Sequence, residues 1–321
     1  MALTPSVEET LFALGLGKRV VGVGDYCLWP PEARALPRLG GLFNPNLERI
    51  VSLRPDLAVL IPSERDLGGK LGRVGIASLI VKNESLTDIE QSFREIARRC
   101  GVPAEGERLA AQWKQDLAPQ PLSWRPKVML SVGRQSGRLV DVLSAGPGTF
   151  YDELLVRMGA VNAFGDALGH YPQVSLEEVV ARAPDVILEL RSDPLPPEVT
   201  AGLINDWNQL PQVAAVRNRR VVVLTGDYVV IPGPRLPQLY REMRAVLEED
   251  DAKAAAATKA DASGAAAEKR PHPPGPPLPS PSQPPGEGGI AAPGLNKFRL
   301  GEGLKAQASS ARGNAPGERT R

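Results

Sequence analysis

A pattern of polar and apolar positions that occurs twice in the chain predicts its architecture. Residues 46–60 contain a short amphipathic stretch, a Pro-Asp pair and an apolar run, and residues 175–189 repeat this order without a gap. In each copy we expect a helix of about two turns, because the proline that follows cannot continue it. The apolar run is typical of a strand buried on both faces. A repeated helix–turn–strand unit at this distance indicates two similar α/β lobes.

The remaining pattern completes an α/β fold in which each lobe has a central, mostly parallel sheet with flanking helices. A helical backbone joins the lobes, and a ligand cleft is expected between them. The predicted domains are an N-terminal lobe (1–82), linking helices (83–124), a C-terminal lobe (125–250) and a tail (251–321). Outside the repeats, helices are expected over 5–14, 86–100, 105–117, 150–158 and 235–249, and strands over 19–23, 77–81, 127–132, 138–142 and 220–224.

The composition changes sharply after residue 250. The tail, residues 251–321, contains 11 of the 32 prolines and few large apolar residues, so we expect it to be disordered. It carries 10 basic and 6 acidic residues, which leaves 28 basic and 31 acidic residues in the rest of the chain. A mildly acidic body of this kind does not favour nucleic-acid binding.

Most patterns that carry chemistry are missing. His170 and His272 are the only histidines, which excludes a His-rich metal site, and neither a phosphate-binding loop nor a Gly-x-Ser-x-Gly motif occurs. We therefore expect no enzyme and no resident cofactor. Cys27 and Cys100 allow one disulfide at most, and free or buried thiols are the favoured interpretation. No apolar run approaches the length of a transmembrane helix.

Aromatic residues on the loops of both lobes are the first candidates for ligand binding. Residues 24–45 form a long loop, and loops of this length in compact domains are usually functional or disordered. Their rings could stack on a flat ligand, although each could instead serve packing alone. The candidates are Tyr26, Trp29, Gly41 and Phe43 from the first lobe and Tyr171 and Tyr228 from the second.

Other candidates lie at helix starts. Gly146 and Gly148, at a strand-to-helix junction, could offer free amides to a ligand oxygen, or form a plain turn capped by the following threonine. Arg235 could face the cleft or cap a helix. Glu48 and Glu177 begin corresponding helices, where the helix dipole favours a carboxylate. They could serve only the helix, or anchor a partner that contacts both lobes.

Residues 4–23, 46–56, 144–149 and 207–222 together resemble the solute-binding proteins of vitamin B12 and iron–siderophore ABC importers. The resemblance runs in order from Ala2 to about Leu247. It implies a two-lobed α/β protein with a helical backbone, little hinge motion and a ligand in the cleft. It also implies that Tyr26 is a cleft aromatic and that Glu48 and Glu177 dock onto arginines of the permease.

The resemblance predicts a substrate-binding component of an ABC importer, with cobalamin or another corrinoid as ligand. A ferric siderophore or haem is the alternative within this class, and a cytoplasmic corrinoid or tetrapyrrole enzyme is the alternative from another class. The expected partners are a permease dimer and its ATPase, and the protein is expected to be a monomer outside the cytoplasm. No signal peptide precedes Ala2, and Met1 stands where an apolar strand residue is expected, so we expect a start assigned too late.

Overall fold

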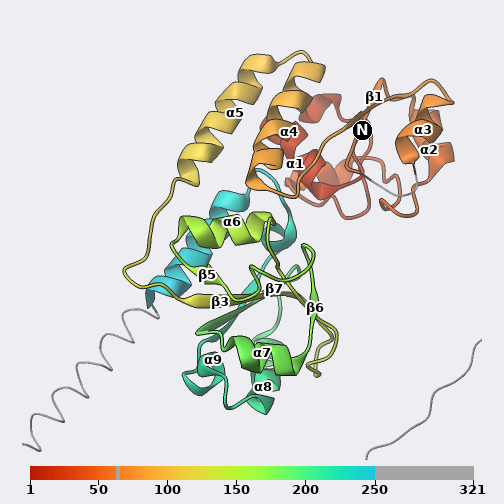
Figure 1. The fold of residues 1–321 in the computed structure, drawn as a ribbon. Helices are drawn as coiled ribbons and strands as arrows, with labels where there is room; N and C mark the ends of the chain where they lie inside the picture. Colours follow the sequence, from red (N-terminus) through yellow and green to blue (C-terminus); the bar gives the residue numbers. More distant parts are fainter. Residues whose placement is uncertain (63–65, 250–321) are drawn as a thin grey trace, which may run out of the picture. The chain divides into compact units, whose positions relative to one another are not determined.

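In the computed structural model, which describes residues 1–62 and 66–249, both copies of the repeat have the same structure. Helix α2 (Leu47–Leu53) leads into strand β1 (Leu57–Leu60), and α7 (Leu176–Arg182) leads into β7 (Val186–Arg191). Figure 1 shows the two copies in separate parts of the ribbon, the first in orange and the second in green. The predicted tail, residues 251–321, lies outside the described residues.

The ends of the repeated helices explain why the pattern folds in this way. The side chains of Asn46 and Ser175 accept hydrogen bonds from the amides three residues later, and so cap the helix starts. Arg54 and Ala183 end the helices with left-handed φ values of 46° and 47°. A proline follows each of them, so the chain leaves the helix sharply and enters the strand.

The N-terminal part contains a small parallel sheet. Strand β1 pairs with β2 (Ala77–Ile80), and single bridges join Ala2 to Val59 and to Val23, and Val23 to Arg38. The prediction of a strand over residues 19–23 is therefore wrong in extent, since only Val23 forms β-bridges to other residues. No described strand lies beside residues 19–21, and a strand needs a neighbour to satisfy its backbone groups.

The C-terminal part contains a six-stranded mixed sheet. Its order is β6-β4-β3-β7-β8, with β5 also beside β3. Strands β3, β5, β7 and β8 are parallel, whereas β4 and β6 are antiparallel to their neighbours. The predicted strand over 138–142 begins later, because Asp141 has a left-handed φ of 51°. In addition to β7, the strands of this sheet are β3 (Lys127–Gly133), β4 (Val142–Ser144), β5 (Val161–Asn162), β6 (Gln173–Val174) and β8 (Val221–Thr225).

The other described helices cover these sheets or connect them. They are α1 (Pro5–Ala13), α3 (Leu67–Gly72), α4 (Leu86–Arg99), α5 (Pro103–Asp116), α6 (Phe150–Arg157), α8 (Pro197–Asp206), α9 (Ala214–Arg217) and residues 236–249. Short 3₁₀ turns are η1 (Gly17–Arg19), η2 (Pro31–Ala35), η3 (Trp207–Gln209) and η4 (Asp227–Val230). Within the described residues, no helix is long and apolar enough to cross a membrane.

Helix α4 belongs to two hydrophobic cores at once. Leu86 and Ile89, from its first half, lie in the core of the C-terminal sheet, whereas Ile96 lies in the core around α1. Helices α4 and α5 pack side by side (Figure 1). The rings of Phe93 and Trp113 meet edge to face, with their centres 5.5 Å apart. The two cores therefore share one helix pair, which makes their connection stiff.

A buried charge network closes the end of β7. Glu189 is 1% exposed and accepts hydrogen bonds from Arg134 (3.0 and 2.9 Å), from the indole of Trp207 (2.9 Å) and from Arg191. Arg134 also donates to Asp206 at 2.8 Å. Every charge in this network has a partner, so it fixes the loops at this edge of the sheet.

Replacing Glu189 by alanine should destabilise the fold strongly, because Arg134 and Trp207 would keep buried donors without their acceptor. The expected loss is about 3–5 kcal/mol of unfolding free energy, measured by urea denaturation. Glu198→Ala, at an exposed position of α8, is the control and should change stability by less than about 0.5 kcal/mol. Equal effects of the two substitutions would contradict the network's role.

Candidate ligand-binding site

A cavity of about 530 Å³ is lined by residues from both halves of the described chain. The first half contributes residues 4–6 at the start of α1, Tyr26, Ile61 and the two residues before the cap of α4. The second half contributes the start of α6, Tyr171 and residues 230–232. A cavity between two halves of a chain is where small ligands usually bind.

Hydrogen bonds hold the start of α4 in place beside this cavity. The side-chain amide of Asn83 donates to Ser6 Oγ at 3.2 Å, which ties the segment to α1. The backbone N–H of Phe150 donates to the carbonyl of Glu84 at 2.8 Å, and the N–H of Leu86 donates to a carboxylate oxygen of Glu153 at 2.8 Å. Residues 83–86 are thus fixed against both α1 and α6.

Tyrosines supply the aromatic surface of the cavity. Tyr26 is 76% exposed and Tyr171 is 40% exposed, which leaves their rings accessible to a ligand. Tyr151 is buried and donates its hydroxyl to the carbonyl of Val229 at 2.7 Å. Partial burial of the Tyr171 hydroxyl raises its pKa, and the negative charge of Glu84 adds a smaller increase. Its hydroxyl therefore remains a hydrogen-bond donor across the neutral pH range.

Of the residues predicted from the sequence, Tyr26 and Tyr171 line this cavity. Gly41 lies next to it, since a Cβ added there would be 3.9 Å from the ring of Tyr26. Phe43 instead lines a smaller cavity of about 200 Å³ beside the start of α2. The roles of all these residues in binding stay predictions.

Trp29 and Tyr228 contact Arg235, and none of the three is among the residues that line this cavity. Arg235 forms two hydrogen bonds with Glu9, one of 2.9 Å from Nε, and a third of 2.7 Å with Asp227. Its guanidinium lies 4.7 Å from the ring centre of Trp29 and 5.8 Å from that of Tyr228. Burial alone would lower the pKa of Arg235, but its bonds to Glu9 and Asp227 raise it, so this residue joins α1 to the C-terminal part as a cation.

Gly146 and Gly148 are used within the turn that precedes α6. The amide of Gly146 donates to the carbonyl of His170 at 2.8 Å, and that of Gly148 donates to Asp152 at 3.3 Å. A Cβ at position 146 would lie 2.5 Å from the carbonyl oxygen of Gly169. The geometry favours the plain turn, with Thr149 capping α6, and lets the segment carrying Tyr171 approach closely.

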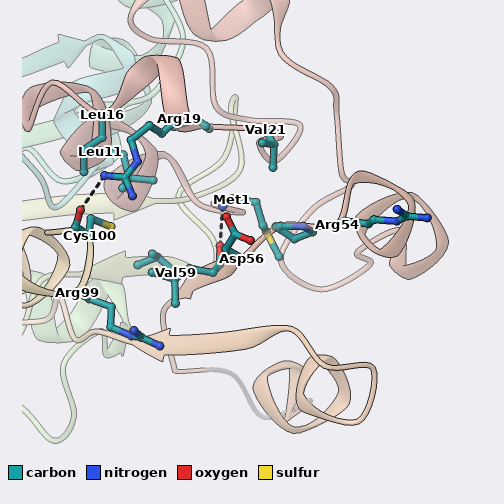
Figure 2. A pocket seen from close by; sticks show the side chains of 13 residues that line it. Met1, Leu11, Leu16, Arg19, Val21, Arg54, Asp56, Val59, Arg99 and Cys100 are labelled. Atoms are coloured by element: carbon teal, nitrogen blue, oxygen red, sulfur yellow. Dashed lines mark hydrogen bonds between the residues drawn. The ribbon is translucent and has the colours of Figure 1, made fainter.

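A second cavity, of about 410 Å³, lies beside Met1 (Figure 2). The amino group of Met1 donates to the carbonyl of Leu57 at 2.8 Å, and Arg19 donates to the carbonyl of Cys100 at 2.7 Å. The described residues that line it come mainly from α1, η1, β1 and the end of α4, and none of them is aromatic. Because it involves the first part of the chain alone, we do not take it as the ligand site.

The structure adds cavity residues that the sequence reasoning missed. Ser6, Asn83 and Glu84 are polar, and Ile231 and Pro232 supply apolar surface. One signal was present in the sequence, since residues 83–85 begin two positions after the predicted strand 77–81 ends. Ligand sites in α/β proteins commonly lie outside the carboxyl ends of parallel strands.

A buried acid without a partner lies beneath residues 4–6. Glu8 has no exposed surface, and neither of its carboxylate oxygens has a hydrogen-bond partner among the described residues. Burial, together with the negative charge of Glu9, raises the pKa of Glu8 to about 8 against the opposing charges of Arg235 and Arg38. Glu8 is thus largely protonated at neutral pH.

Comparison with known proteins decides the family. The model of the periplasmic binding protein family matches residues 1–228. The chain is a member of the periplasmic binding protein family. It is 27% identical over 242 residues to the vitamin B12-binding protein of Vibrio parahaemolyticus, a match that covers 73% of this chain and 84% of the relative. An uncharacterized ABC transporter substrate-binding lipoprotein of Bacillus subtilis is 28% identical, covering 76% of this chain and 77% of that protein.

Solved structures of other periplasmic binding proteins share the fold. The vitamin B12-binding protein of Vibrio cholerae matches with a TM-score of 0.63 and 26% identity, covering 77% of this chain and 95% of that one. The heme-binding protein of Roseiflexus sp. RS-1 matches with a TM-score of 0.64 and 28% identity, covering 77% and 97%. The α/β fold class expected from the sequence and the family resemblance are both confirmed.

The protonated state of Glu8 predicts how the stability of this periplasmic binding protein depends on pH. Between the ordinary pKa of 4.5 and about 8, the folded protein holds a proton that the unfolded chain has lost. The contribution of the protonated Glu8 carboxyl to the stability of the fold is therefore complete below pH 4.5. This contribution is lost as the pH rises to about 8. Glu8→Gln should remove this loss, so the variant should melt several degrees above the parent at pH 8 and close to it at pH 5.

Thermal melts of both proteins at pH 5, 6, 7 and 8 provide the measurement, with Glu198→Gln as the exposed control. The control should follow the parent at every pH. If the melting temperatures of the parent and of Glu8→Gln change with pH in the same way, Glu8 is not the group that causes the pH dependence of stability.

Proposed function

We propose that the chain is the substrate-binding component of an ABC importer and that it binds cobalamin or another corrinoid in the cavity formed by both halves. The observation that carries the proposal is the pair of accessible tyrosines, Tyr26 and Tyr171, which come from different halves of the chain and line one cavity with mixed apolar and polar lining. Relatives named vitamin B12-binding protein support it. The protein works outside the cytoplasm and delivers its ligand to a permease and its ATPase.

The polar groups of the cavity suit a ligand edged with amides. A corrinoid is a flat macrocycle whose side chains end in primary amides, each with two N–H donors and one carbonyl acceptor. Tyrosine rings offer a flat face to the macrocycle, and their hydroxyls donate to amide carbonyls. Asn83 and Glu84 accept from amide N–H groups. Haem is the second candidate, favoured by the similarity to the Roseiflexus protein.

Cyanocobalamin should bind the purified protein, with Tyr26→Ala and Tyr171→Ala each weakening affinity about tenfold or more, or about 1.4 kcal/mol. Isothermal titration calorimetry measures this directly. Tyr228→Phe is the control, because the Tyr228 hydroxyl bonds to Glu242 outside the cavity, and its affinity should stay within about twofold of the parent.

Haem and ferric siderophores are titrated in parallel. Binding of haem or a ferric siderophore without binding of cyanocobalamin would contradict the corrinoid proposal and select the alternative ligand. Chemical conversion of any of these ligands would instead favour an enzyme.

Glu48 and Glu177 are the proposed contacts with the permease. Glu48 and Glu177 both lie in the first turn of their helix, at equivalent positions of the repeat, and both are exposed. In the described part of the chain, neither side chain is engaged in a hydrogen bond or ion pair. Each is therefore available to an arginine of a permease subunit, with which it would form a charge-assisted hydrogen bond.

The double variant Glu48→Ala, Glu177→Ala should fold and bind ligand normally but fail to support transport. Losing a paired charge at an interface costs about 2–5 kcal/mol when the partner stays buried, so stimulation of the permease ATPase should fall at least tenfold. Reconstituted transport and ATPase assays provide the measurement. Glu178→Gln is the matched control, because it sits beside Glu177 and keeps its capping role. Full-rate transport by the double variant would leave both residues with only their favourable interaction with the helix dipole.

A further inference from the structure

The described lining of the candidate cavity carries one negative and no positive formal charge. Its lining contains one ionisable carboxylate, that of Glu84, and no lysine, arginine or histidine among the described residues. Arg235 is committed to Glu9 and Asp227, and the rings of Trp29 and Tyr228 contact its guanidinium. An anionic group of a ligand would therefore meet no compensating cation in the cavity.

The backbone around Glu84 is fixed, whereas its side chain is available. The carbonyl of Glu84 accepts a hydrogen bond from Phe150, and the flanking residues Asn83 and Leu86 are bonded to Ser6 and Glu153. The carboxylate itself makes no hydrogen bond or ion pair within residues 1–62 and 66–249. Its charge reaches the hydroxyl of Tyr171, where it contributes to the raised pKa, so both groups face the same space.

The Glu84 carboxylate and the Tyr171 hydroxyl would interact differently with neutral and with anionic groups on the periphery of a ligand. A primary amide can donate an N–H to the Glu84 carboxylate and accept from the Tyr171 hydroxyl. A carboxylate or catecholate at the same place has no donor for Glu84 and repels it. Like charges placed opposite each other in a binding site are strongly unfavourable, which is a common way to reject a wrong partner.

We propose that Glu84 determines ligand specificity, so that the cavity accepts uncharged or cationic macrocycles edged with amides and rejects macrocycles edged with carboxylates or catecholates. The proposal rests on the proposed function, because it assigns the ligand class to the same cavity. It separates amide-edged corrinoids from haem, whose two propionates are anionic, and from anionic ferric siderophores.

The test compares ligands that differ in charge but hardly in shape. Cyanocobalamin is titrated beside derivatives in which one side-chain amide at a time is hydrolysed to a carboxylate. The parent should bind at least one of these derivatives tenfold or more weakly than cyanocobalamin. In Glu84→Gln this ratio should fall to about threefold or less, while Glu198→Gln should keep the parent's ratio. Thermal melts confirm that both variants fold.

Two results would overturn the inference. If the parent binds the amide and carboxylate forms equally, or if Glu84→Gln keeps the full discrimination, Glu84 does not select by charge, and the proposed function stands without it. If no corrinoid binds, the proposed function fails, and haem is then compared with its dimethyl ester. Tighter binding of the diacid than of the diester would reject the inference, and Glu84-dependent preference for the diester would support it.

Discussion

The ion pair between Glu9 and Arg235 is the contact on which the geometry of the candidate site depends. These residues are 226 positions apart, and the pair joins α1 to the segment before the closing helix. Glu9 is 1% exposed, so loss of Arg235 would leave a buried charge without its partner, which is among the more costly changes in a protein. Residues 4–6 come shortly before Glu9 in the chain and residues 230–232 shortly before Arg235, and both of these segments line the cavity.

Helix α4 supplies the second constraint. Its two halves belong to different cores, and the indole of Trp113 on the adjacent α5 donates to the carbonyl of Gly233 at 3.2 Å. Together with the Glu9–Arg235 pair, this bond ties the segment before the closing helix to both α1 and the helix pair. A cavity held in this way is largely preformed, which suits a bulky and rigid ligand because little ordering cost is incurred on binding.

The repeated pattern made much of this fold predictable. The helix–proline–strand order is encoded by residues that are neighbours in the sequence, so both copies of the repeat could be identified. The aromatic residues predicted on loops included Tyr26 and Tyr171. The contact of Arg235 with Trp29 and Tyr228 could not be predicted, because it joins segments that are distant in the sequence. Gly146 was considered a candidate amide donor, whereas its role depends on the close approach of Gly169. Glu84 was missed because a polar residue before a helix cap is ordinary in sequence.

The central claim is that ligand binds in the cavity shared by both halves and not in the cavity beside Met1. Hydrogen exchange followed by mass spectrometry, with and without cyanocobalamin, tests it most directly. The account predicts added protection in peptides that cover residues 4–6, 83–84 and 230–232, with no change over 16–21 and 99–100. Protection confined to the latter two segments would contradict it.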